Sequence, residues 1–299
     1  MYIHNFSAGP SILPKTVFEE ASKAVIDFTG NGLSILEISH RSKDFIKVMD
    51  EAEALVRELL SIKDDYAVLF LSGGASTQFF MAPMNLLKQT DKVAYTDTGT
   101  WASKAIKEAK LLAEVDVVTS SKDDNYMHLP KDIVVNNQHK YLHITSNNTI
   151  YGTQYGTFPE VAIPLVCDMS SDIFSRPFDI NKFDLVYAGA QKNMGPAGTT
   201  LVIVKKSVLG HTERKIPAML DYRNHIENGS MYNTPVSYTH LRAHETVLDL
   251  VCRLLLETKN SSLCDYYITC LLYTYQIPRK LPRSSRPSCP YKETIINNH

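Results

Sequence analysis

The chain has 299 residues, of which 44% are hydrophobic and 21% charged, and its formal net charge is −1. This composition is typical of a globular protein with one large domain or two smaller ones, and the near-zero charge argues against nucleic acid or a membrane surface as a partner. No apolar run reaches the ~18 residues of a transmembrane helix and no signal pattern opens the chain, so we expect a cytoplasmic protein. The five cysteines lack CxxC spacing, which predicts neither a metal site nor a disulfide framework.

The N-terminal stretch predicts an irregular arm followed by two helices. Small residues and two prolines over residues 5–14 favour an ordered, non-helical arm. Thr16 is in position to cap an amphipathic helix over residues 17–28. Apolar side chains recur at helical spacing over residues 45–60, which predicts a second, longer helix.

The segment between these helices, residues 35–41, predicts a strand that ends in His40 and Arg41. An arginine here is either a surface charge or, beside a histidine in a loop, a clamp for an anion. The residues alone leave both interpretations open.

Five apolar segments predict buried strands that each end in a different chemical group. These strands cover residues 66–71, 93–97, 141–145, 165–168 and 185–188. The first strand is followed by a Gly73-Gly74 turn and a helix over residues 78–87, and the second by Trp101 and a helix over residues 102–112. The third is followed by a polar loop that contains Thr149. The fourth ends in Asp168, and the fifth leads into a loop that contains Lys192. Further strands at residues 115–118 and 200–204 complete an α/β pattern.

Each group also has an ordinary structural interpretation. A lone lysine is usually a solvated loop residue, a Gly-Gly turn often binds nothing, and an aspartate is a common loop residue. One cofactor, pyridoxal 5′-phosphate (PLP), uses all five groups together. A lysine forms the imine, a helix N-terminus holds the phosphate, an aromatic ring stacks on the pyridine, and a carboxylate keeps the ring nitrogen protonated. The pattern therefore predicts a PLP site at one rim of the sheet.

Four motifs extend this interpretation: Asn5-Phe-Ser-Ala-Gly-Pro10, Ser39-His-Arg41, Gly73-Gly-Ala-Ser-Thr-Gln-Phe79 and Tyr187-Ala-Gly-Ala-Gln-Lys-Asn-Met-Gly-Pro-Ala-Gly198. Together they resemble phosphoserine aminotransferases, which belong to the fold-type-I, class V aminotransferases. The resemblance covers about residues 1–235. It implies a PLP-binding large domain with a mostly parallel seven-stranded sheet flanked by helices, and a family small domain that is missing or replaced here.

The resemblance also implies a role for each matching residue. Lys192 matches the Schiff-base lysine, and Asp168, rather than Asp172, matches the partner of the ring nitrogen. Arg41, helped by His40, matches the clamp for the distal anion of the substrate. The other implied cofactor contacts are Ala75, Ser76, Trp101, Thr149, Gln191 and, from the neighbouring subunit of a homodimer, Asn233 and Thr234.

The reaction implied by the resemblance is reversible amino transfer between L-glutamate and 3-phosphohydroxypyruvate, which gives O-phospho-L-serine in serine biosynthesis. Some bacterial members also act in pyridoxine biosynthesis. Two alternatives stay open: another class V aminotransferase, and a truncated PLP-binding protein without turnover.

The resemblance ends after Pro235, where the composition changes. All 13 glycines precede residue 230, and four of the five cysteines follow it. We expect an arm over residues 1–15, a PLP-binding domain over residues 16–236, and a tail over residues 237–299. The tail should be helical over residues 246–257 and then disordered.

The origin of this tail has two interpretations, a lineage-specific replacement or a frame-shifted reading frame. In the resembling family, an arginine of the small domain binds the substrate α-carboxylate. No counterpart is found in this sequence, and losing such a clamp removes both affinity and orientation.

Overall fold

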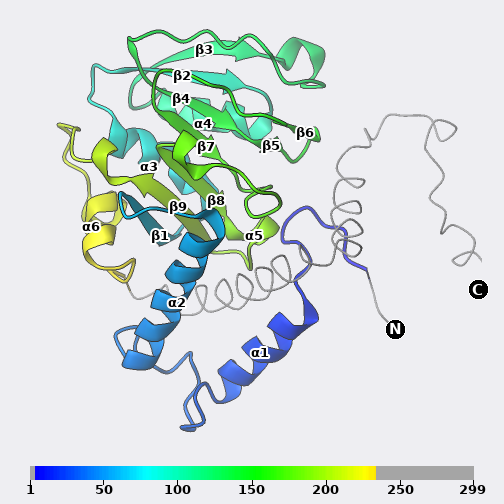
Figure 1. Ribbon diagram of the computed structural model, residues 1–299, viewed down its shortest axis with the longest axis vertical. Coiled ribbons are helices and arrows are strands. Elements are labelled where there is room, and N and C mark those ends of the chain that lie inside the picture. Colours follow the sequence, from blue (N-terminus) through cyan, green and yellow to red (C-terminus); the bar gives the residue numbers. More distant parts are fainter. Residues whose placement is uncertain (1–3, 234–299) are drawn as a thin grey trace, which may run out of the picture.

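A seven-stranded sheet forms the centre of the protein, with the strand order β1-β9-β8-β7-β4-β2-β3 (Figure 1). We describe residues 4–233 of a computed structural model of the chain. Strand β9 runs antiparallel to both of its neighbours, and the other pairs are parallel. The predicted mostly parallel α/β sheet is therefore confirmed.

The strands lie within two residues of the predicted bounds at each end. They are β1 (Tyr66–Ser72), β2 (Lys92–Asp97), β3 (Glu114–Ser120), β4 (His139–Thr145), β7 (Leu165–Asp168), β8 (Leu185–Gly189) and β9 (Thr199–Lys205). A separate two-stranded ribbon is formed by β5 (Asn147–Asn148) and β6 (Thr153–Gln154).

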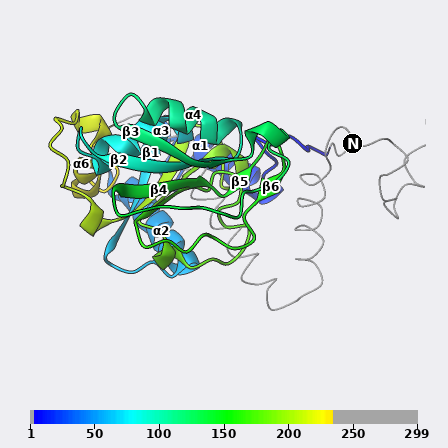
Figure 2. The ribbon, with the colours of Figure 1, turned by 90° about the horizontal axis from the view of Figure 1, so that it is seen from above.

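Helices cover both faces of the sheet (Figure 2). On one face lies α2 (Lys43–Leu60), and on the other lie α3 (Gly74–Leu86) and α4 (Thr100–Ala109). Because successive side chains of a strand point to opposite faces of the sheet, each buried strand contributes side chains to the hydrophobic cores on both faces. In β1, the α2 core receives Tyr66, Val68 and Phe70, and the α3–α4 core receives Ala67, Leu69 and Leu71. Both layers consist of buried hydrophobic side chains, whose close packing fixes the strand ends relative to one another.

Two N-terminal predictions were wrong. Helix α1 (Lys15–Ile26) begins directly after Pro14, and no side chain caps it, so Thr16 lies inside the first turn instead of before it. Residues 35–41 form turns rather than a strand. Ile35 is fully buried and its N–H donates to the Ala24 carbonyl at 3.0 Å, so the segment packs against α1 and pairs with no strand.

Several predictions concern residues outside the described range. They are the role of Thr234, the division at residue 236, and the tail with its helix over residues 246–257. The absence of a small domain is likewise a statement about that part of the chain. Within residues 4–233, no helix is long and apolar enough to cross a membrane, and no group of His, Cys, Asp or Glu side chains could hold a metal ion.

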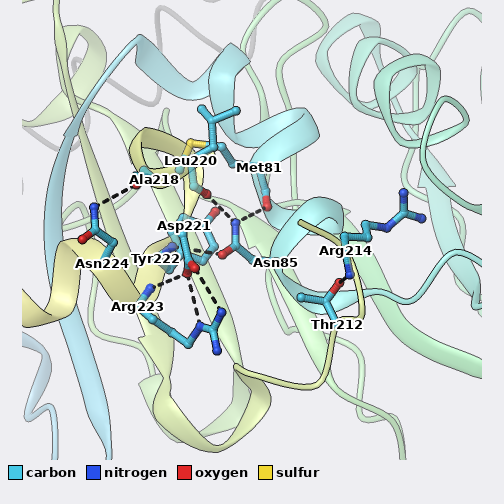
Figure 3. A network of polar contacts seen from close by, with 10 residues as sticks. All are labelled: Met81, Asn85, Thr212, Arg214, Ala218, Leu220, Asp221, Tyr222, Arg223 and Asn224. Carbon is cyan, nitrogen blue, oxygen red and sulfur yellow. Dashed lines mark hydrogen bonds and ion pairs between the residues drawn. The ribbon is translucent and has the colours of Figure 1, made fainter. Parts of the chain in front are cut away.

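The segment that follows β9 returns to the sheet through a network of hydrogen bonds around Asn85 (Figure 3). The buried Asn85 amide donates to the carbonyls of Met81 at 2.9 Å and Leu220 at 2.7 Å. Its oxygen accepts the N–H of Tyr222 at 2.9 Å. Tyr222 begins α6 (Tyr222–Glu227), so one side chain of α3 satisfies the backbone groups at the start of α6.

We expect Asn85→Ala to destabilise the fold by about 2–4 kcal/mol, because it leaves the Tyr222 N–H and the Leu220 carbonyl without partners. Urea unfolding measures this. The matched control is Asn224→Ala, which removes two exposed bonds, one to the Ala218 carbonyl and one from the Asn228 amide, and should stay within about 0.5 kcal/mol of the parent. Equal stability of both variants would show that the Asn85 contacts are dispensable.

Candidate active site at the sheet rim

The five chemical groups predicted from the strand ends meet at one edge of the sheet. Strands β2, β4, β7 and β8 are parallel, and β1 points the same way because β9 is antiparallel to both β1 and β8. The carboxyl ends of all five strands therefore share one rim, where ligands of open α/β sheets bind.

Lys192 lies in a single turn of helix, α5 (Ala190–Asn193), and not in the loop that the sequence predicted. Its Nζ donates to Thr149 Oγ1 at 2.6 Å and to Ser171 Oγ at 3.1 Å. The same atom lies 5.1 Å from the centroid of the Trp101 ring. Burial lowers the pKa of Lys192, and the charges of Asp168 and Asp172 oppose this shift. The amine thus loses its proton more easily than an exposed lysine does.

Asp168 and Asp172 lie in different hydrogen-bond environments, although burial raises the pKa of both carboxyls. Asp172 is tied to protein groups: it accepts from Ser146 and, at 3.1 Å, from Gln154 Nε2. Asp168 Oδ1 accepts the N–H and the hydroxyl of Ser170, at 3.0 and 2.6 Å. Within residues 4–233, no hydrogen bond engages Asp168 Oδ2, so this oxygen is available to a bound group.

The N-terminus of α3 lies beside Lys192's helix. Gly73 and Gly74 have positive φ angles of 103° and 72°, which glycine adopts without strain, and α3 begins at Gly74, four residues before the predicted start. A side chain at Gly189 would come within 2.9 Å of Gln191 Oε1 and 3.4 Å of Ala75 Cβ. The first turn of α3 and the Gln191 side chain therefore flank the same small space. Gln191 Oε1 is buried there without a protein partner in the described chain.

The structure does not bring Arg41 and His40 into this space. The connection from α1 to α2, which contains both residues, lies at the bottom of Figure 1, well apart from α5 beside β8. His40 is buried, which together with the charge of Arg41 lowers its pKa, and Arg41 itself is exposed.

Asn233 is half-buried near β1, the edge strand. Its neighbour Ser230 accepts the Phe70 N–H at 3.0 Å, which docks this segment on β1. Among the described residues, no hydrogen bond joins Asn233 to Lys192 or Gln191. Thr234 lies outside the described residues.

Sequence reasoning missed three hydroxyl residues of the site. Ser170 accepts the Gly189 N–H at 3.0 Å while it donates to Asp168, so it links the carboxylate to the start of α5. Ser171 contacts both Thr149 and Lys192, and Ser11 of the arm contacts the Lys192 carbonyl. Ser170 and Ser171 directly follow Asp168, a weak signal that points to the correct rim; nothing in the sequence places Ser11 there.

Comparison with known proteins shows the family. The model of the family "Aminotransferase class-V" matches residues 3–237. The chain belongs to the class-V aminotransferases. Curated relatives include phosphoserine aminotransferases of Flavobacterium psychrophilum, 64% identical over 233 residues, and Bacteroides fragilis, 56% identical over 232 residues. Each match covers 78% of this chain and 65% of the relative, so the chain spans slightly less than two thirds of these proteins.

Solved structures agree with this assignment. Phosphoserine aminotransferase from Bacillus circulans subsp. alkalophilus is 48% identical with a TM-score of 0.81, over 85% of this chain and 71% of that one. The PLP-bound phosphoserine aminotransferase from Trichomonas vaginalis is 33% identical with a TM-score of 0.80, over 84% of this chain and 76% of that one. An aspartate aminotransferase from Thermus thermophilus, 17% identical with a TM-score of 0.67, shares the fold.

We expect Asp168→Asn to stabilise the ligand-free protein at pH 7. Burial raises the Asp168 pKa, so between its ordinary and its raised pKa the folded state binds more protons than the unfolded state, and stability falls as pH rises through this window. The amide keeps an acceptor for Ser170 and removes this cost.

Urea unfolding at pH 7 should therefore give a higher midpoint for Asp168→Asn than for the parent. The two midpoints should converge at about pH 3, where Asp168 of the parent is protonated in both the folded and the unfolded state. Asp50→Asn, on the exposed face of α2, is the matched control and should not move the pH 7 midpoint. A lower midpoint for Asp168→Asn at pH 7 would contradict the direction given for the Asp168 pKa.

Proposed function

We propose that this protein is a PLP-dependent phosphoserine aminotransferase, which transfers the amino group of L-glutamate to 3-phosphohydroxypyruvate. The observation that carries the proposal is the position of Lys192. Its half-buried amine lies over the Trp101 ring, beside Asp168, at the rim where five strand ends of a class-V aminotransferase meet. Relatives up to 64% identical carry this name.

The residues at the rim fit PLP. The available oxygen of Asp168 suits a protonated ring nitrogen, and the first turn of α3, with Ala75 and Ser76, presents backbone N–H groups to a phosphate. The buried side-chain oxygen of Gln191, which has no partner in the described chain, lies beside this turn. Trp101 offers a flat ring for stacking. When bound, PLP supplies an electron sink for the carbanion formed at the substrate Cα.

The amine of Lys192 is the group that we expect to carry protons. Its lowered pKa keeps a larger unprotonated fraction near neutral pH, as a general base requires. Thr149 and Ser171 accept hydrogen bonds from Nζ and hold it at the rim between transfers. Asp168 keeps its negative charge close to this amine because Ser170 supplies two hydrogen bonds to one of its oxygens. These contacts position the reacting groups before substrate arrives.

The place of Arg41 supports a homodimer. Because the α1–α2 connection lies apart from α5 of its own chain, an Arg41 that clamps the substrate phosphate has to come from a second copy. The proposed contacts of Asn233 and Thr234 with a neighbouring subunit's cofactor have the same consequence. We accordingly propose a cytoplasmic homodimer with shared sites, built on the domain limits expected from the sequence.

One assay separates this proposal from its alternatives. Turnover of L-glutamate with 3-phosphohydroxypyruvate by the purified chain supports the phosphoserine aminotransferase, and turnover only with other amino acids supports another class V aminotransferase. Covalent attachment of PLP without turnover of either supports a truncated cofactor-binding protein.

Lys192→Ala should abolish the covalent attachment of PLP and lower amino transfer by about 10²–10⁴-fold or more, because the variant has neither the amine nor the general base. Borohydride reduction followed by peptide mass spectrometry locates the attachment. Lys110→Ala, at an exposed position after α4, is the control and should keep both properties. Attachment that persists in Lys192→Ala would identify a different lysine.

Asp168→Asn should retain bound PLP and lose more than about a hundred-fold in amino transfer, since the ring nitrogen is left without a charged partner. Asp172→Asn should lose less than about ten-fold, because Asp172 is engaged by Ser146 and Gln154. Steady-state kinetics and a PLP binding titration on both variants measure this. The reverse order of losses would assign the ring-nitrogen role to Asp172.

A further inference from the structure

The N-terminal arm contacts the Lys192 turn, 181 residues away in sequence. The Ser11 N–H donates to the Gln191 carbonyl at 3.0 Å, and the Ser11 hydroxyl donates to the Lys192 carbonyl. A side chain at Gly9 would come within 3.0 Å of Lys192 Cγ, so the arm also lies flush against the lysine side chain. The arm therefore contacts both the backbone and the side chain of this lysine.

The single turn of α5 requires such contacts. With only the four residues Ala190–Asn193, it leaves most of its carbonyls without partners inside the helix. The N–H groups of Met194 and Gly195 both turn back to Ala190, at 3.0 and 2.8 Å. The carbonyls of Gln191 and Lys192 are bonded by the arm instead. An isolated helical turn of this length is not stable by itself, so outside contacts decide its geometry.

We propose that the arm positions the catalytic amine: Ser11 fixes the backbone of the Lys192 turn, and the bare backbone of Gly9 forms the wall along which the lysine side chain extends toward Thr149 and Trp101. Ser11 and Gly9 are positioning residues, since they act through Lys192. The inference rests on the role proposed for Lys192 in the preceding section and deepens it.

The charges around the amine define what releasing the arm should change. Asp168 at the end of β7 and Asp172 in the turn after it raise the Lys192 pKa, and burial lowers it with the larger effect. From α4, Lys104 Nζ lies 4.5 Å from the centroid of the Trp101 ring. If the arm is released, the amine gains solvent while both carboxylates stay in place. The Lys192 pKa should then rise toward its ordinary value.

The test uses ligand-free protein. The rate at which acetic anhydride modifies Lys192, measured by peptide mass spectrometry as a function of pH, reports the titration of the amine without any turnover. Ser11→Ala removes the hydroxyl bond, Ser11→Pro also removes the N–H bond, and Ser11→Thr keeps both. Ser7→Ala, an exposed serine of the same arm, is the matched control.

We expect the titration midpoint of Lys192 to move upward in Ser11→Ala and further in Ser11→Pro, and to stay unchanged in Ser11→Thr and Ser7→Ala. The affinity for PLP, titrated in parallel, should weaken about five-fold in Ser11→Ala, the effect of one hydrogen bond of typical strength. Gly9→Ala should slow PLP attachment, since its methyl group displaces Lys192 Cγ.

A role in stability alone would lower the unfolding midpoint of the Ser11 variants and leave the Lys192 titration where the parent has it, and this result would overturn the inference. Its failure is distinct from failure of the proposed function. The labelling of Lys192 reports on the arm even in a chain without turnover, whereas PLP attachment to Lys192 in the parent is decided by the Lys192→Ala comparison.

Discussion

The structure of this rim depends on one electrostatic constraint: the Lys192 amine and the Asp168 carboxylate influence each other's charge in a largely buried space. Burial disfavours the charged form of each, which lowers the pKa of Lys192 and raises that of Asp168, while their mutual attraction opposes both shifts. Such a pair is costly to keep unless its geometry is fixed by other contacts. Ser170 binds the carboxylate, and Thr149 and Ser171 bind the amine.

Ser170 is the centre of that support. It donates to the Asp168 carboxylate and accepts the Gly189 N–H, so the end of β7 and the start of α5 share one side chain. The buried side chains next to Asp168 are neutral. Tyr187 pairs with Asp168 across β7 and β8, and its hydroxyl is hydrogen-bonded to His143 Nε2 at 2.9 Å. Burial lowers the pKa of His143 to about 3. At neutral pH this histidine gives Asp168 no positive charge. The positive partner of the carboxylate is therefore supplied from the Lys192 side of the rim.

The sequence predicted the sheet well because its strands are short apolar runs bounded by polar and glycine residues, and tertiary packing agrees with that pattern. It predicted less well where two signals compete. Residues 35–41 begin with apolar residues typical of a strand, but Ile35 is buried against α1 and α2, and the segment needs no pairing strand. Lys192 follows a strand with small and polar residues, as loops do, yet the turn closes into a helix because Ala190 accepts two backbone N–H groups.

Some residues of the candidate site could be predicted from the sequence and others could not. Residues that follow their own strand, such as Trp101, Thr149 and Asp168, can be found from local sequence because strand direction brings them to one rim. Ser11 cannot be found in this way, because its contact joins segments 181 residues apart and no local sequence pattern indicates it.

Arg41 is the opposite case, since the sequence motif marks it, while the α1–α2 connection that contains it lies apart from α5 of its own chain (Figure 1). At the edge of the sheet, Ser230 accepts the Phe70 N–H and so docks the segment before Asn233 on β1. One chain thus brings Lys192, Asp168 and Trp101 to the same rim, and the homodimer proposed above would bring Arg41 to it from a second copy.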